Sequence, residues 1–400
     1  MNAGVLFLLA ASTGVAAETA VINMASNFPS AAISAVKATG SGISGPGKPV
    51  EGDGVVPGLV SGKAITAENR DQVASDKTVN EGLLPPIKPV WDVHMRDTII
   101  ILGGDGNYYL TGSTGDNIWK HNDGIELWKS PDLQHWIYLG LVWSIEKQGG
   151  WERLWRDHRG PTRAIWAPEI RYIHHNYYLT FGMPPGGMSI LKSTSGKPEG
   201  PYVHATDPGR PLVGGIGPTK DSFLIDPTLF EDDDGKVYFT YGPAKVIARM
   251  KDDLSGFAEP PREIHLADRS EEPGTRRDAG NDLGFEGATL FKANGKYYLG
   301  STDKVHGRYS MCVAVADNVY GPYRMRHESV PCAGGTGFFK AKDGHWYTSF
   351  FGDDSSAPWR EKPGIVRVDF DTEGRVIVAK EQPGFILLSP PAVSTTSKTP

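Results

Sequence analysis

Three acidic residues stand at the same distance from a phrase that the chain repeats. Asp97, Asp226 and Glu286 each lie twelve residues before the second aromatic residue of this phrase, which first appears as DGNYYLTGST at 105–114. Carboxyl groups that are held close together raise one another's pKa values, so one can stay protonated while another is ionised at the same pH. The spacing therefore predicts a cluster of carboxylates that can act as an acid and a base.

The repeated phrase also predicts the fold. Its five copies follow an apolar, β-branched run and a short turn that usually contains Asp-Gly or Asn-Gly, the strongest short signal for a hairpin. A third strand follows in most copies. Self-similar groups of three or four antiparallel strands at a regular period indicate a five-bladed β-propeller, whereas the strands of a β-sandwich do not come in such groups. The second aromatic residues are Tyr109, Tyr178, Tyr238, Tyr298 and Tyr347.

A propeller would bring the acidic residues together, because the first strand of each blade lines the central channel. The positions twelve residues before the five tyrosines hold Asp97, Trp166, Asp226, Glu286 and Gly335. We expect them at one level of the channel. A single carboxylate at this position could simply cap a turn. Burying three charged groups costs folding free energy, which favours a functional role for them. Carboxylates bind sugar hydroxyls and an indole stacks on apolar sugar faces, so this set predicts a carbohydrate site.

Composition is that of an ordinary globular protein. Of 400 residues, 39% are hydrophobic and 22% are charged, and 49 glycines and 30 prolines favour short strands joined by turns. The formal net charge of −6 gives no basic surface for nucleic acid. No segment is long and apolar enough for a membrane span, and we expect a monomer. Cys312 and Cys332 are either bridged or two buried thiols.

The two ends of the chain lack the repeated strand pattern of its central part. Residues 1–17 combine an apolar run with a small-residue ending, which predicts a signal peptide and a secreted or periplasmic protein. Residues 18–84 lack any strand or helix period and predict a disordered linker. The propeller is expected over 85–385, with a tail at 386–400.

Several phrases resemble glycoside hydrolase family 43, whose members are five-bladed propellers. They are MRDTIIILGGDGNYYLTGS, WAPEI at 166–170, IDPTLFEDDDGKVYFTYG at 225–242 and FEGATLFKANGKYYL at 285–299. The resemblance implies an inverting hydrolase of arabinose-, xylose- or galactose-containing glycans that requires no cofactor. It makes Asp97 the general base, Asp226 the residue that orients the acid and tunes its pKa, and Glu286 the general acid. REKPGI at 360–365 is similar to a family segment whose arginine contacts sugar, which points to Arg360.

The sequence departs from the family pattern at three places. RDT and EGA replace the usual RDP and EGP, and Gly334 and Gly335 stand where many members carry a histidine that orders a central metal ion. A structural calcium is therefore doubtful. The alternatives are a carbohydrate-binding propeller without turnover and a retaining β-fructosidase-type enzyme, although the latter's Trp-x-Asn-Asp-Pro phrase is absent. The tryptophan-rich insert at 143–166 either packs beneath a loop or contacts outer sugar units.

Overall fold

The structure is a computed structural model that describes residues 83–115, 118, 121–159, 164–184, 186–215, 224–268, 283–352 and 361–388. All of these belong to one compact unit, Lys63–Pro400. The predicted signal peptide, nearly all of the predicted linker and the last residues of the predicted tail lie outside the described ranges. Among the described residues, no helix has the length and apolar character needed to cross a membrane.

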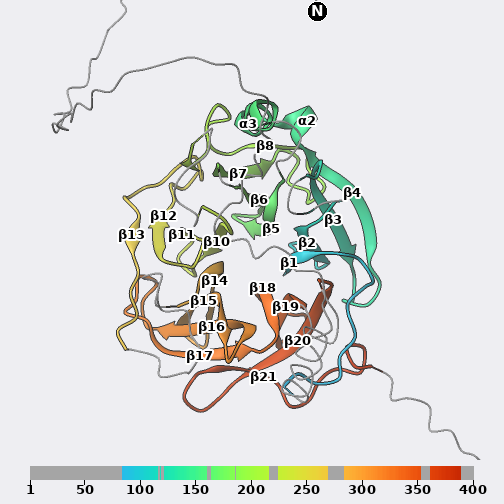
Figure 1. The fold of residues 1–400 in the computed structure, drawn as a ribbon, viewed down its shortest axis with the longest axis vertical. Helices are drawn as coiled ribbons and strands as arrows, with labels where there is room; N and C mark the ends of the chain where they lie inside the picture. Colours follow the sequence, from blue (N-terminus) through green and yellow to red (C-terminus); the bar gives the residue numbers. More distant parts are fainter. Residues whose placement is uncertain are drawn as a thin grey trace, which may run out of the picture. The chain divides into compact units, whose positions relative to one another are not determined.

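Five antiparallel sheets follow one another along the chain and form a ring, seen in Figure 1 as five groups of strands around a common centre. The five-bladed β-propeller is confirmed. Blade one consists of β1 (Arg96–Leu102), β2 (Tyr108–Ser113), β3 (Gly124–Ser130) and β4 (Ile137–Ser144); blade two of β5 (Trp166–Ile173), β6 (Asn176–Met183), β7 (Gly187–Ser193), β8 (Tyr202–His204) and β9 (Val213–Gly214); blade three of β10 (Thr228–Glu231), β11 (Val237–Tyr241), β12 (Val246–Arg249) and β13 (Arg262–Glu263); blade four of β14 (Glu286–Ala293), β15 (Lys296–Val305), β16 (Arg308–Ala316) and β17 (Arg324–Val330); and blade five of β18 (Ala333–Lys340), β19 (Trp346–Gly352), β20 (Pro363–Phe370) and β21 (Val376–Val378).

The first strand of every blade is the innermost one. β1, β5, β10, β14 and β18 surround the centre of the ring in Figure 1, and β1 contacts both β5 and β18. In four of the sheets the remaining strands follow outward in chain order, and in blade two β8 and β9 both pair with β7. The starts of the innermost strands therefore meet at one end of the central channel, as the sequence predicts.

The repeated tyrosine phrase has a structural reason. All five second aromatic residues are buried between sheets, and none exposes more than 6% of its surface. In blades one and five the tyrosine hydroxyl also donates a hydrogen bond to the aspartate of its own turn: Tyr109 to Asp105 at 2.8 Å and Tyr347 to Asp343 at 2.7 Å. Because a buried hydroxyl needs a partner, the phrase couples a turn aspartate to a core tyrosine four residues later.

The ring closes between its first and last blades without sharing a sheet. The Ser349 hydroxyl on β19 accepts a hydrogen bond from the Ile100 amide at 3.0 Å and donates to the Thr98 carbonyl at 2.8 Å. Next to this junction, Ile87 and Leu387 form an isolated antiparallel bridge. Both described ends of the chain thus lie against each other at the closure.

The tryptophan-rich insert packs on the outside of blade two. It contains α2 (Ile145–Gln148) and α3 (Trp151–Arg159), and the side chains of Trp143, Trp151 and Trp155 are fully buried. The Glu152 carboxylate on α3 bonds His204 of β8 at 3.0 Å, which ties the insert to the blade. Of the two interpretations of these three aromatic residues, the structure supports packing beneath a loop.

Candidate active site

Each innermost strand has a residue of left-handed backbone conformation at or just before its start. The residues and their φ angles are Asp97 (52°), Ala167 (43°), Asp226 (53°), Gly287 (74°) and Gly335 (50°). In blades one, two, four and five, strand pairing shifts register directly after this residue. Such bulges redirect side chains, and left-handed backbone at residues other than glycine costs about 1–3 kcal/mol, which folded proteins tolerate mainly at functional sites.

This geometry corrects one sequence-based expectation. Asp97 and Asp226 occupy the same bulge position, but Glu286 lies one residue before it, at the position that Arg96 and Trp166 hold in blades one and two. The three carboxylates are therefore not at one register. A side chain one residue away leaves a strand on the other face, so Glu286 approaches the channel from a different direction than the two aspartates do.

The reason is the length of the first turn in each blade. The second tyrosine pairs with the residue eight positions earlier in blade one, Ile101, but with the residue seven positions earlier in blade two, Arg171. Blades three and five match blade one, and blade four matches blade two. The residue twelve positions before the tyrosine therefore lies one position nearer the start of the inner strand in blades two and four than in the other three blades.

A narrow cavity on the channel is lined by residues of all five blades. Both aspartates line it, and a third acidic residue, Glu169 of β5, joins them. The complete lining is Asp97, Ile99, Ala167, Glu169, Asp226, Gly287, Ala288, Gly335 and Thr336. Two of the three carboxylates predicted from the sequence thus meet at the centre of the ring, while Glu286 is not part of this lining.

Asp97 is held by a relay of hydrogen bonds. The Ser113 hydroxyl donates to Asp97 Oδ2 at 2.6 Å and accepts a hydrogen bond from the Ala167 amide at 2.8 Å. Burial raises the pKa of Asp97 above its usual value, while the charge of Arg96 and the Ser113 hydrogen bond oppose that rise. The ionised form therefore has one hydroxyl donor and a cation beside it.

Asp226 has a different environment. Its Oδ2 accepts a hydrogen bond from the Gly287 amide at 2.7 Å. Burial raises the pKa of Asp226 well above its usual value, and the charges of Asp97 and Glu286 raise it further. The two aspartates occupy the same bulge position, yet Asp226 is the one that holds a proton more tightly.

Glu286 rests on a buried tyrosine. The Tyr309 hydroxyl donates a hydrogen bond to Glu286 Oε1. Burial and the Glu286 charge raise the pKa of Tyr309 well above 10, so the phenol stays protonated and remains a donor. The Arg96 guanidinium lies 4.1 Å from the centre of the Phe351 ring and pairs with Glu361 at 3.0 Å. One arginine therefore lies beside the acidic cluster and links it to blade five.

Comparison with known proteins identifies the family. Residues 87–376 match the family model described as Glycosyl hydrolases family 43. The chain belongs to glycoside hydrolase family 43. It is 29% identical over 256 residues to a "Beta-xylosidase" of Xylanibacter ruminicola, covering 54% of this chain and 75% of the relative. It is 26% identical over 253 residues to a "Xylosidase/arabinosidase" of Bacteroides ovatus, covering 54% and 73%.

Solved structures agree with this assignment in fold. A "thermostable family-43 glycoside hydrolase" superposes with a TM-score of 0.56 at 21% identity, covering 74% of this chain and 96% of the other. Together with the family match, the relatives show that this chain is a glycoside hydrolase. The carboxylate cluster described above is its candidate active site.

Three residues of this family 43 enzyme were not singled out from its sequence. Arg96 directly precedes Asp97, and Glu169 lies inside the WAPEI phrase, so both stood next to predicted positions. Glu169 is buried and pairs with Arg171 at 2.7 Å; burial raises its pKa, and the Arg171 charge opposes the rise. Tyr309 is the second residue of β16, and no sequence signal distinguishes it from a core tyrosine.

The remaining predicted positions have mixed outcomes. Trp166 begins β5, is partly exposed, and is absent from the lining of the narrow cavity, so sugar contact by this indole stays a prediction. Arg360 lies outside the described residues. Cys312 and Cys332 are both buried, and no disulfide joins them.

The centre of this family 43 propeller does not suit a metal ion ordered by a histidine of blade five. A Cβ atom at Gly335 would lie 2.6 Å from the Cα atom of Asp97, and one at Gly334 would lie 1.8 Å from the Tyr309 ring. A side chain at either position would force Asp97 or Tyr309 to move. Among the described residues, no group of three or more His, Cys, Asp or Glu side chains is arranged to hold a metal.

Proposed function

We propose that this enzyme hydrolyses glycosidic bonds of xylose- or arabinose-containing glycans with inversion of configuration. The names of the two relatives above support the choice of sugars, and galactose-containing glycans are a further prediction from the family resemblance. One observation carries the mechanism. Three carboxylates from three blades, Asp97, Asp226 and Glu286, lie near enough for the charges of Asp97 and Glu286 to raise the pKa of Asp226, and each has a different set of partners.

Asp97 is assigned as the general base. Inversion requires an ionised carboxylate that removes a proton from water on the face of the sugar opposite the leaving group, with the two carboxyl groups roughly 6.5–9.5 Å apart. The Ser113 hydroxyl and the Arg96 charge favour the ionised form of Asp97 against the effect of burial. The hydroxyl also fixes the rotamer of the carboxylate, so the second oxygen is directed to the water.

Glu286 is assigned as the general acid, which donates a proton to the departing oxygen. The Tyr309 hydroxyl donates to Oε1 and so holds the Glu286 carboxyl group in place. Asp226 accepts its hydrogen bond from Gly287, the neighbour of Glu286. We infer that Asp226 orients the Glu286 segment through this hydrogen bond, and that repulsion between the two carboxyl groups disfavours ionising both at once.

Two further residues are proposed to hold the sugar. Trp166 begins β5 at the strand position that corresponds to Glu286, which places an indole one blade from the base. Arg360 directly precedes Glu361 in the sequence, and Glu361 is the carboxylate that pairs with Arg96.

The stereochemistry of the first product tests the mechanism. Aryl xylosides, arabinofuranosides and galactosides are incubated with the full chain, and the anomer released is followed by proton NMR before mutarotation. We expect the anomer opposite to that of the substrate. Release of the same anomer would make Asp97 a nucleophile and support the retaining, fructosidase-like alternative, while the preferred aryl glycoside identifies the sugar.

A further inference from the structure

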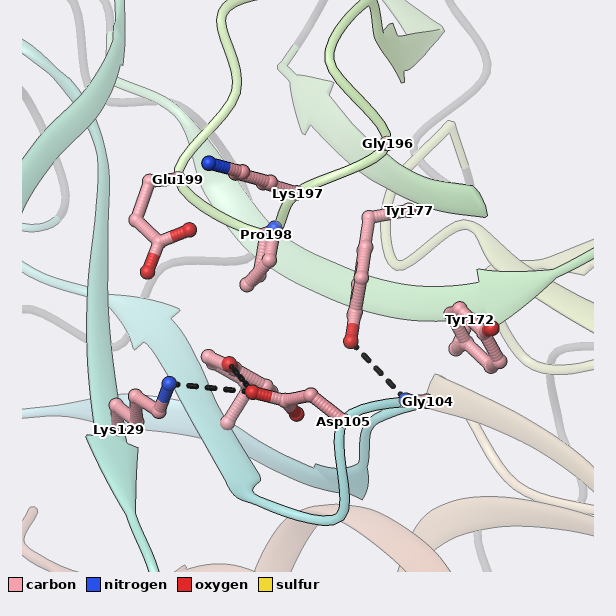
Figure 2. Close-up of a pocket in the computed structure, with 10 residues that line it drawn as sticks. Gly104, Asp105, Lys129, Tyr172, Tyr177, Gly196, Lys197, Pro198 and Glu199 are labelled. Atoms are coloured by element: carbon pink, nitrogen blue, oxygen red, sulfur yellow. Dashed lines mark hydrogen bonds and ion pairs between the residues drawn. The ribbon is translucent and has the colours of Figure 1, made fainter. Parts of the chain in front are cut away.

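A second, larger cavity opens where blade one meets blade two. Its volume is about 410 Å³, within the range of about 300–1,000 Å³ that is typical of small-molecule sites. Its walls come from the turn after β1, from β3, from β5 and β6, and from the loop between β7 and β8 (Figure 2). The lining residues are Gly104, Asp105, Tyr109, Lys129, Tyr172, Tyr177, Gly196, Lys197, Pro198 and Glu199.

This cavity is separate from the carboxylate cluster. Gly104 follows Asp97 by seven residues along β1 and the turn, and a strand rises about 3.3 Å per residue, so the two lie roughly 20 Å apart. The cluster is at the starts of the innermost strands and the cavity is at their far ends. No step proposed above uses its residues.

The same place is filled at another blade boundary. Between blades three and four, the strand register puts Asp232 and Asp233 where blade one has two glycines, and Lys292 where blade two has Tyr172. The Lys292 ammonium lies 2.7 Å from Asp232 and 2.8 Å from Asp233. An ion pair thus closes the space that is open between blades one and two.

The boundary between blades five and one is filled as well. Lys342 takes the position of Gly104, and its ammonium lies 5.0 Å from the centre of the Tyr108 ring and bonds the Pro131 carbonyl at 2.6 Å. The backbone geometry is otherwise the same, because the Lys342 amide donates to Tyr108 as the Gly104 amide donates to Tyr177. The cavity is therefore open because small or aromatic residues, Gly104 and Tyr172, stand where the other two boundaries have charged side chains.

Two glycines make room for the aromatic wall. A Cβ atom at Gly104 would lie 2.2 Å from the Tyr172 ring, and one at Gly103 would lie 2.5 Å from the Tyr177 hydroxyl. Glycine weakens a strand end and often marks a place where a ligand or another group approaches the backbone closely. Here it lets the Tyr172 and Tyr177 rings, 4.9 Å apart, lie directly on the turn.

Polar groups of both charges face the same space. The pKa of Asp105 is lowered to about 2, because hydrogen bonds from Tyr109 and Asn107 outweigh the opposing effect of burial. Lys129 bonds Asp105 at 3.1 Å, and its side chain is 29% exposed. Figure 2 shows Glu199 and Lys197 across the opening from them. The cavity therefore offers two cations and two anions, which gives no net attraction for an ion.

The loop that carries this upper wall is fixed before any ligand arrives. The Tyr202 hydroxyl donates to the Pro198 carbonyl at 2.7 Å, and the Ser193 hydroxyl donates to the Lys197 carbonyl at 2.7 Å. Pro198 is buried, while Lys197 and Glu199 are exposed. A preformed wall lowers the entropy cost of binding.

We propose that this cavity is a second, non-catalytic site that binds one neutral sugar residue of a polysaccharide. The partly exposed Tyr172 ring packs against the C–H face of a sugar ring, while Asp105 accepts hydrogen bonds from its hydroxyls and Lys129 donates to them. The proposal rests on the proposed function only in taking the ligand to be carbohydrate. Its role is to hold a polymer on the face of the propeller opposite the carboxylates.

The test counts binding sites in a full chain that cannot turn over its ligand. In an Asp97→Asn background, xylohexaose and, separately, arabinohexaose are titrated by calorimetry. We expect a stoichiometry of two for at least one of them. Adding Tyr172→Ala should leave one site and weaken retardation in a soluble arabinoxylan gel by about fivefold or more, the usual effect of removing a central aromatic contact. Tyr138→Ala, which removes an exposed tyrosine of β4 outside the cavity, is the matched control and should change neither.

A filling variant guards against a folding artefact. Gly104→Asp together with Tyr172→Lys rebuilds the ion pair seen between blades three and four, and it should abolish the second site without loss of stability. Two results would overturn the proposal. One is a stoichiometry of one in the parent chain with both hexasaccharides, and the other is equal retardation of the Tyr172→Ala protein and its parent in the arabinoxylan gel. The proposed function is read separately, because hydrolysis of a small aryl glycoside by the Tyr172→Ala enzyme with Asp97 intact should be unchanged.

Discussion

Replacing Asp226 with asparagine should make this enzyme more stable while it loses activity. The carboxylate is surrounded by negative charge from Asp97, Glu286 and Glu169, and its one described donor is the Gly287 amide. Asparagine keeps an oxygen for that donor and removes the buried charge. Substitutions that relieve such functional strain commonly add about 0.5–2 kcal/mol to the free energy of unfolding, or a few degrees in Tm for a domain of this size.

The gain should depend on pH in one direction. Folding raises the pKa of Asp226 above its unfolded value of about 3.9, so the folded chain binds this proton more tightly. Below the unfolded pKa the carboxyl group is protonated in both states, so it does not lower the free energy of unfolding. As the pH rises toward the folded-state pKa, the buried charge lowers that free energy increasingly. The advantage of Asp226→Asn should therefore be larger at pH 7 than at pH 4, where it should nearly disappear.

Calorimetric unfolding at pH 7 and pH 4 checks both statements. Asp234→Asn is the control, because Asp234 is an exposed turn residue whose pKa is lowered by its hydrogen bond with Lys236, and its removal should bring no gain at pH 7. An Asp226→Asn protein that is less stable than its parent at pH 7, or equally stabilised at both pH values, would refute the electrostatic reasoning.

The remaining predictions concern the proposed reaction. Glu286→Gln keeps the acceptor for Tyr309 but removes the acid, so hydrolysis of natural glycans should fall on the order of 10²–10⁴-fold while an aryl glycoside with a good leaving group loses much less; equal losses in steady-state assays would take the acid role from this residue. Asp97→Asn should abolish turnover of both substrates, since water activation is needed with either leaving group, and residual activity on the aryl glycoside would contradict its role as the base. Ser113→Ala removes a hydrogen bond to a charged group and should lower kcat roughly tenfold with little change in KM; an effect on KM alone would make Ser113 a substrate contact.

Much of the fold could be predicted from the sequence because each blade repeats one local solution. The turn aspartate and the tyrosine four residues later recur because Asp105 and Tyr109 bond each other and the tyrosine fills the core. Strand order then follows from short turns. What a repeat count cannot supply is register, and a turn shorter by one residue moved Glu286 and Trp166 away from the level of Asp97.

The residues that tune the candidate site were harder to find. Tyr309 reaches Glu286 from a strand 23 residues later, and Glu361 reaches Arg96 across 265 residues. Contacts between residues so far apart produce no local sequence motif, because buried tyrosines and surface glutamates occur throughout β-proteins. The cavity between blades one and two was equally hidden, since it depends on which side chain stands at Gly104.

The closure between the first and last blades has a consequence for the newly made chain. Ile100 and Ser349 are separated by 249 residues, and a ribosome adding about 5–20 residues per second needs roughly 12–50 s to make the second after the first. During that interval the inner strand of blade one lacks its neighbour, and Arg96 lacks Glu361. Blades one to four can fold as they emerge, but the acidic cluster is completed only when blade five arrives. A chain that stops before residue 361 would carry all three proposed catalytic carboxylates and still lack an assembled site.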